Sequence, residues 1–414
     1  MQLGAVLVFD AGPLQLRHGG IDVERLRAYT AMRLPAVPRA RERRARFALG
    51  GLEVFVEDPS FQLEYHVRHA SLPRPGDERA LKRLAARVFS QALDPDKPLW
   101  ELWIVEGLED SRFALIAKCD AALLEAGASA GGTFARATEE LLSRVGSLAR
   151  PSRLIQRVAG GVRVALDFAE VALAPAAAPL GRGDGGGAHR RIDWLALASA
   201  DVAAIRGRLG GSVRDVVLAA LAGGLRRVFE RRGASSDTGA IRVLTPICVG
   251  GRLESPRLRL PIEASDARAR LVSLRAAGER LPAGDASAGA SPLHQLATLS
   301  GAVDLGRRAD VVAVELDGPP SDSSVLGARL RAIVPVLPSF EGCALGVTVT
   351  RLGERIFVGL SADASRLPDL SALTDGMAAA FDELRRAAAE PAAKRGAARG
   401  GRPRARRRAE AEVR

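Results

Sequence analysis

Residues 98–127 read PLWELWIVEGLEDSRFALIAKCDAALLEAG, and this stretch decides the fold of the chain. Two apolar runs, 99–105 and 113–118, are separated by a short polar turn, a pattern that predicts a β-hairpin. Cys119, Asp120 and Ala121 come directly after the second run. Any chemistry at the exit of this strand therefore depends on those three side chains.

Strand-like and helix-like segments alternate on both sides of the hairpin. Strands are predicted at residues 2–9, 52–57, 191–197, 241–249, 329–337, 344–350 and 355–361, and helices at 22–32, 81–92, 133–148, 199–210, 213–228 and 368–389. Asp77, Ser199 and Ser212 precede three of these helices and are expected to cap them. The pattern indicates an α/β protein in two halves, each with a mixed sheet and flanking helices.

The length of 414 residues is too great for one ordinary core and predicts two domains. Residues 151–191 change in composition, with Pro175, Pro179 and a glycine-rich run at 181–187, and are interpreted as an interdomain linker. The expected division is therefore 1–150 for the first subdomain, 151–191 for the linker and 192–390 for the second subdomain. Residues 391–414 form a tail.

The net charge of +12 is concentrated in that tail. After Pro391, nine basic residues stand against two acidic ones and contribute +7. A basic run rich in Pro, Gly and Ala cannot bury enough surface to fold, so a disordered tail is predicted. It is either a solvated end or a contact with the anionic surface of a membrane or lipid droplet. Nucleic acid is disfavoured, because no aromatic residue is interleaved with the basic ones.

The cysteines are few and scattered. Cys119, Cys248 and Cys343 show neither metal-ligand spacing nor a disulfide framework, which favours a reducing cytoplasm and no metal site. No signal peptide is recognisable at the start of the chain. No run reaches the ~20 apolar residues that a membrane helix needs, so any membrane contact is expected to be peripheral.

The hairpin segment resembles the wax ester synthase/diacylglycerol acyltransferase family of bacteria. In that family the stretch runs P-L-W-E, a strand, and then H-H-A-L-V-D-G. Setting the two side by side places the paired histidines at Asp120 and Ala121, and the Asp-Gly at Glu125 and Ala126. The resemblance spans about residues 2–384. Because family members usually open with a short helix before the first strand, this chain is expected to start one element late.

The resemblance implies two chloramphenicol-acetyltransferase-like subdomains that face each other, with a tunnel between them for acyl-CoA and a lipid acceptor. In the family the second histidine is the catalytic base, and the Asp four residues later fixes the local structure. Here Ala121 cannot accept a proton, Glu125 adds a methylene, and Ala126 lacks the backbone freedom of Gly. The motif departs from the family at all four defining positions.

Neighbouring residues are poor substitutes for the base. Asp120 is adjacent to Ala121, but adjacent side chains at a strand exit point to opposite faces. Cys119 would need an activating partner, and none is evident. His66 and His69 match a segment that family members often share, which favours structural roles for both.

Other family motifs are altered in the same way. The N-D that opens the long second-half helix is Arg214-Asp215 here, so only Asp215 is retained. Residues 250–254 lack the family's asparagine, and residues 314–319 keep only Gly-Pro of S-N-V-P-G-P. Scaffold residues such as Trp100 and Glu101 persist. Residues that build the fold are kept while residues that carry the chemistry are replaced.

Three hypotheses remain open from the sequence. The first is a family acyltransferase, acting on acyl-CoA and a long-chain alcohol or diacylglycerol, whose catalysis is lost or much reduced. The second is a non-catalytic protein that binds acyl-CoA or regulates an active paralogue as its partner. The third is an active enzyme with a rebuilt site. None of them implies a bound cofactor, apart from acyl-CoA as substrate or ligand.

Overall fold

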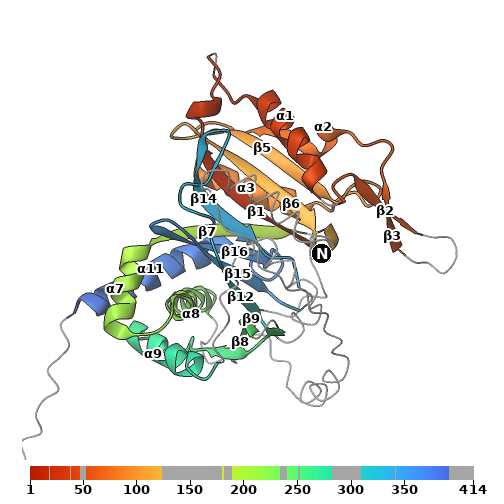
Figure 1. Ribbon diagram of the computed structural model, residues 1–414. Coiled ribbons are helices and arrows are strands. Elements are labelled where there is room, and N and C mark those ends of the chain that lie inside the picture. Colours follow the sequence, from red (N-terminus) through yellow and green to blue (C-terminus); the bar gives the residue numbers. More distant parts are fainter. Residues whose placement is uncertain are drawn as a thin grey trace, which may run out of the picture.

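The computed structural model in Figure 1 describes residues 1–17, 19–37, 39–46, 53–123, 180, 189–233, 240–249, 252–281, 309–340 and 342–390. Its main framework is a pair of six-stranded mixed sheets, each accompanied by helices. Among the described helices, none is both long and apolar enough to cross a membrane.

The first sheet has the order β13-β14-β1-β6-β5-β4. Its strands are β1 (Gln2–Asp10), β4 (Val67–Ser71), β5 (Trp100–Leu108), β6 (Arg112–Asp120), β13 (Ser324–Val325) and β14 (Ala328–Val336). β5 and β6 pair antiparallel, which confirms the predicted hairpin. The buried strand β1 lies between β6 and β14 and pairs antiparallel with both. The β6 exit is fixed in this sheet, because Gln2 pairs with Asp120.

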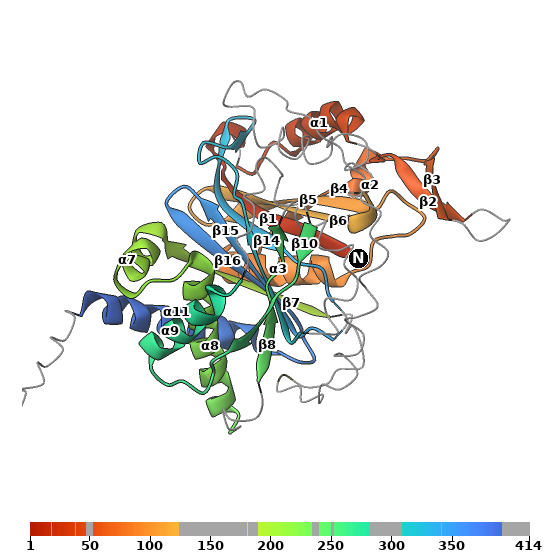
Figure 2. The same ribbon diagram turned by 60° about the horizontal axis from the view of Figure 1, so that its bottom comes forward.

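The second sheet has the order β11-β8-β12-β15-β16-β7. Its strands are β7 (Arg190–Ala198), β8 (Ile241–Leu244), β11 (Arg257–Leu260), β12 (Val311–Leu316), β15 (Leu345–Leu352) and β16 (Arg355–Asp363). Four helices gather beside it in Figures 1 and 2: α7 (Ser199–Leu209), α8 (Val213–Arg231), α9 (Ala267–Gly278) and α11 (Leu370–Ala389). Their apolar faces and the sheet form a second hydrophobic core.

The two sheets are not divided by chain order. β13 and β14 come from the second half of the sequence but complete the first sheet beside β1. The first sheet is therefore not built from residues 1–150 alone, as the predicted division had it. Helix α3 (Glu78–Ser90) lies between the sheets in both views, and its Lys82 pairs with Asp193 on β7 at 2.6 Å. The boundaries of the two subdomains remain a prediction.

Smaller elements decorate the first sheet. They include the helices α1 (Val23–Arg33) and α2 (Leu63–His66) and the two-stranded ribbon of β2 (Glu42–Arg46) and β3 (Glu53–Glu57). Figures 1 and 2 place α1 on the opposite side of the sheet from α3 and show the β2–β3 ribbon projecting outward.

Local predictions were mostly confirmed, with two corrections. Asp77 and Ser212 cap α3 and α8 through their side chains, as predicted. Ser199 is not a cap, because Ala198 holds that position and no side chain bonds there. The strand predicted at 241–249 is broken into β8 and β9 (Ile247–Val249), because Pro246 has no N–H to continue the ladder.

Several predictions fall outside the described residues. These are the helix at 133–148, the motif positions Glu125 and Ala126, most of the linker, and the basic tail 391–414. At the end of the linker, residues 190 and 191 already belong to β7.

Candidate functional site

A buried cation lies two residues before the strand exit. The Lys118 side chain is fully buried, and its Nζ donates to the carbonyl oxygens of Val88 (2.9 Å) and Gln91 (2.6 Å) at the end of α3. Burial lowers the pKa of Lys118, while the nearby carboxylate of Glu101 opposes that shift. A cation at a helix C-terminus also complements the helix dipole. Lys118 thus joins β6 to α3 from inside the core.

The Glu101 carboxylate completes this polar network. Its Oε2 lies 4.0 Å from Lys118 Nζ and accepts a hydrogen bond from Trp103 Nε1 at 3.0 Å, and its Oε1 lies 3.3 Å from Arg68 Nη2. Trp100, next to it, donates from Nε1 to the Ala40 carbonyl at 2.7 Å. The polar atoms of the P-L-W-E segment are therefore occupied by scaffold contacts.

His66 is a second buried group beside this network. Its Nδ1 lies 2.8 Å from the Trp100 carbonyl oxygen, and its ring stacks on Phe61 and Trp100 at centroid separations of 5.0 and 4.6 Å. Burial lowers the pKa of His66, against the opposing effects of the Trp100 carbonyl and Glu101. His69 lies instead 3.1 Å from Glu106. These contacts agree with structural roles for both histidines.

Cys119 faces the interior of the first core. Burial raises the pKa of its thiol to about 12, and the negative charge of Asp120 adds to the effect. Because the thiolate is the nucleophile, a thiol with this pKa is inert near neutral pH. The geometry therefore favours Cys119 as a small core side chain.

Asp120 is engaged as an anchor. Its Oδ1 accepts from Arg44 Nη2 at 2.8 Å and from the Ala122 N–H at 3.1 Å, and its Oδ2 accepts from the Met1 amino group at 2.9 Å. Arg44 belongs to β2, so this carboxylate ties the projecting β2–β3 ribbon to the exit of β6. Three donors already hold this carboxylate in its role as an anchor.

Ala121 occupies the position expected for the base. It begins a short helical turn, is 5% exposed, and donates its N–H to the Met1 carbonyl at 2.8 Å. Its methyl side chain packs in the first core and has no atom that accepts a proton. The strand exit is thus held in place by hydrogen bonds but carries no general base at this residue.

Asp215 sits apart from this exit. It forms a capping box at the start of α8: its Oδ2 accepts from the Ser212 N–H at 2.8 Å, and its own N–H donates to Ser212 Oγ at 3.1 Å. Its Oδ1 is buried without a hydrogen bond and lies 3.7 Å from Arg214 Nε. Asp215 and Asp120 share no interaction partner among the described residues. The retained aspartate therefore has a clear structural role.

Sequence reasoning missed the Lys118–Glu101 network. The available signal was a lysine inside an otherwise apolar strand, which is costly unless the charge finds partners. Its main partners are backbone carbonyls of α3, and no sequence pattern identifies these. The structure thus brings Lys118, Glu101, Trp100 and His66 together beneath the exit, with Asp120 and Ala121 at it.

The sequence of the chain is similar to one family of acyltransferases along most of its length. Profiles of one family match the chain twice, as the wax ester synthase/diacylglycerol acyltransferase catalytic domain at residues 1–139 and the C-terminal domain at 266–385. Two proteins of Mycobacterium tuberculosis that carry the name diacylglycerol O-acyltransferase are 27% and 28% identical to it. The matches cover 80% and 81% of this chain and 76% and 81% of theirs.

Solved structures share the fold. A wax ester synthase/diacylglycerol acyltransferase from Marinobacter aquaeolei VT8 aligns with a TM-score of 0.68 at 23% identity, covering 94% of this chain and 95% of that one. The first condensation domain of the CDA synthetase aligns with a TM-score of 0.52 at 16% identity, covering 95% and 92%. The likeness confirms the predicted fold class of two acyltransferase-like subdomains with mixed sheets. With both profiles matched in order along the sequence, the chain belongs to the wax ester synthase/diacylglycerol acyltransferase family.

Proposed function

We propose that this chain is a wax ester synthase/diacylglycerol acyltransferase-family protein that binds acyl-CoA but has lost most or all of its acyl-transfer catalysis. The observation that carries the proposal is the side chain at position 121. Acyl transfer from a thioester to an alcohol requires removal of the hydroxyl proton. Ala121 has no proton acceptor, and the carboxylate beside it is held by Arg44 and the Ala122 N–H.

Loss of the base alone lowers the rate by on the order of 100- to 10,000-fold. Binding of acyl-CoA does not require the catalytic base. The protein can therefore keep its affinity for acyl-CoA while it loses turnover. The scaffold around the exit supports retained binding, because the Lys118–Glu101 network and both cores are complete. The family reaction itself, ester formation from acyl-CoA and a long-chain alcohol or diacylglycerol, is what the chain has lost.

The direct test incubates purified protein with labelled palmitoyl-CoA and either hexadecanol or diacylglycerol. Ester and free CoA are followed together, and acyl-CoA affinity is measured in parallel. We expect saturable binding with negligible ester. Ester formation well above the no-protein background would overturn the loss of catalysis and favour a rebuilt site.

Restoring the motif gives a second test. A variant carrying Asp120→His, Ala121→His, Glu125→Asp and Ala126→Gly should form ester faster than the natural protein. Its matched control carries the same changes except Ala121→His, so the two differ only at the base position. If both folded variants form ester alike, a missing base at position 121 is not the sole cause of the loss, and Arg214 and the altered segments 250–254 and 314–319 are the next changes to restore.

A further inference from the structure

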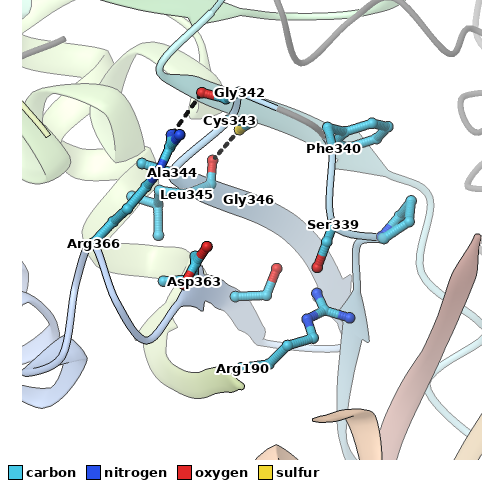
Figure 3. A pocket seen from close by; sticks show the side chains of 13 residues that line it. Arg190, Ser339, Phe340, Gly342, Cys343, Ala344, Leu345, Gly346, Asp363 and Arg366 are labelled. Carbon is cyan, nitrogen blue, oxygen red and sulfur yellow. Dashed lines mark hydrogen bonds between the residues drawn. The ribbon is translucent and has the colours of Figure 1, made fainter. Parts of the chain in front are cut away.

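A recess opens at the end of the molecule that also holds Asp120. It is a small recess open to solvent, and Figure 3 shows the side chains around it. Its walls come from the start of β7, the loop after β14, the start of β15 and the end of β16. β14 pairs with β1, and β1 pairs with β6, so the recess lies beyond β1 from the strand exit.

An unpaired arginine forms one wall of this recess. Arg190 is 8% exposed, and its Nη2 donates to the Leu337 carbonyl oxygen. Its Nε–H is buried and has no acceptor. Among the described residues, no carboxylate lies within ion-pair distance of its guanidinium. Burial lowers the pKa of Arg190 to about 10, which still leaves it charged at neutral pH. A buried donor without an acceptor is unfavourable, and a bound anion would relieve it.

Other donors surround the same space. Ser361 is buried on β16, and Ser339 lies at the mouth, where Figure 3 shows its hydroxyl turned toward Arg190. Arg366 stands across the recess and donates to the Gly342 carbonyl at 2.7 Å. Asp363, an acidic residue among the described lining residues, accepts at Oδ1 from Ser365. The buried guanidinium of Arg190 therefore brings a positive charge to the wall of the recess, with hydroxyl donors beside it.

We propose that this recess binds a phosphate group, with Arg190 as its principal partner. The donors come singly from three segments of the chain, an arrangement that matches a tetrahedral phosphate accepting from several directions. A planar carboxylate binds arginine best through two parallel hydrogen bonds. The site stands independently of the proposed function, since it involves neither Ala121 nor acyl transfer. The phosphate belongs either to a coenzyme or to a free or lipid-borne phosphate.

The test uses the full-length protein and inorganic [³²P]phosphate in equilibrium dialysis at constant ionic strength. One saturable site is expected. Ser361→Ala and Arg190→Lys should each weaken binding by about tenfold or more, since each removes a donor to an anion. Arg355→Gln is the matched control, because Arg355 is exposed at the opposite end of β16 and should leave binding unchanged. Circular dichroism verifies folding, and Ser361→Ala carries the test if Arg190→Lys does not fold.

Competition distinguishes the sources of the phosphate. Displacement of phosphate by CoA at lower concentration supports the site and assigns it to a coenzyme. Phosphate binding that CoA leaves unchanged supports the site and assigns it to another phosphate. The proposal is overturned by absence of saturable binding, by equal binding in Ser361→Ala and the natural protein, or by occupancy with decanoate but not phosphate.

Discussion

Strand β6 contains two regions with opposite chemistry within four residues. At Lys118 a charge is fully enclosed, and backbone carbonyls and Glu101 compensate it. At Asp120 and Ala121 the strand leaves the sheet, and the polar contacts there anchor the β2–β3 ribbon, the turn and Met1. The first region is scaffold and is complete. The second is where the resemblance to the family predicts a catalytic histidine, and it holds an alanine.

Family residues that are retained around the exit of β6 are therefore no sign of acyltransferase activity. Trp100 and Glu101 are engaged with Ala40, Trp103, Arg68 and Lys118, all of which belong to the first subdomain. Selection for folding alone is enough to keep them. Changes at the buried region should therefore alter stability strongly, and changes at the exit should alter it weakly.

The largest effect is expected from Lys118→Met. The substitution removes the donor to Val88 and Gln91 and leaves the buried Glu101 carboxylate with less compensation. Removing one partner of a buried ion pair costs about 3–5 kcal/mol. We expect that decrease in the free energy of unfolding, measured by chemical denaturation.

Arg275→Met is the control for Lys118. Arg275 is 49% exposed and lies 2.8 Å from Glu279, which is 61% exposed, so loss of this pair should cost less than about 1 kcal/mol. Equal losses in the two variants would mean that the Lys118 network does not support the fold.

The next largest decrease in the free energy of unfolding is expected from His66→Phe, and its size should depend on pH. His66→Phe keeps the stacking but removes the hydrogen bond to the Trp100 carbonyl, which should cost about 2 kcal/mol at pH 7.5. Because the folded-state pKa of His66 is below its ordinary value near 6.5, the unfolded chain takes up this proton first. Stability of the natural protein should therefore fall as the pH drops below about 6.5.

Denaturation at pH 7.5 and pH 5 measures this slope. His66→Phe should show a smaller decrease between the two pH values than the natural protein. A full slope in His66→Phe would assign the acid sensitivity to other groups.

Sequence patterns predicted local structure well and distant pairing poorly. Apolar runs located β1, β6 and β16, and Asp77 and Ser212 were recognised as caps from residue type alone. The joining of β14 to the first sheet was not predictable, because its apolar run would suit either sheet. The partners of Lys118 are backbone carbonyls of α3, and backbone carries no sequence signal.

For the candidate site, too, some features could be predicted from the sequence and others could not. The absence of a base at Ala121 follows from alignment with the family motif, which requires only the register of one strand. The engagement of Asp120 does not follow, since Arg44 lies 76 residues away on another ribbon. Nor could the unpaired Nε–H of Arg190 be foreseen, because it depends on which groups fail to reach it.

A smaller effect is expected from Asp120→Ala at the exit. The lost contacts with Arg44, the Ala122 N–H and the Met1 amino group are partly exposed and should contribute about 1 kcal/mol. Arg44→Ala and the double variant complete a cycle, in which we expect a coupling of about 0.5 kcal/mol or more. Ester formation, measured alongside, should stay at background in all three variants, as in the natural protein. If the natural protein instead forms ester and the Asp120 variants do not, that carboxylate is a working base.

The smallest effect is expected for alkylation of Cys119, which measures how well the end of β6 is buried just before its exit. With a pKa of about 12, about one Cys119 in 10⁴ is a thiolate at pH 8, and the side chain is closed to reagents. Iodoacetamide should leave Cys119 unmodified in the native protein and alkylate it fully in denaturant, as mass spectrometry of peptides would show. Cys343, half-buried in the recess with a pKa of about 11, provides the internal comparison and should react faster. Faster modification at Cys119 than at Cys343 would mean that the exit opens in solution. The end of β6 would then not be the closed scaffold that the contacts of Lys118 indicate.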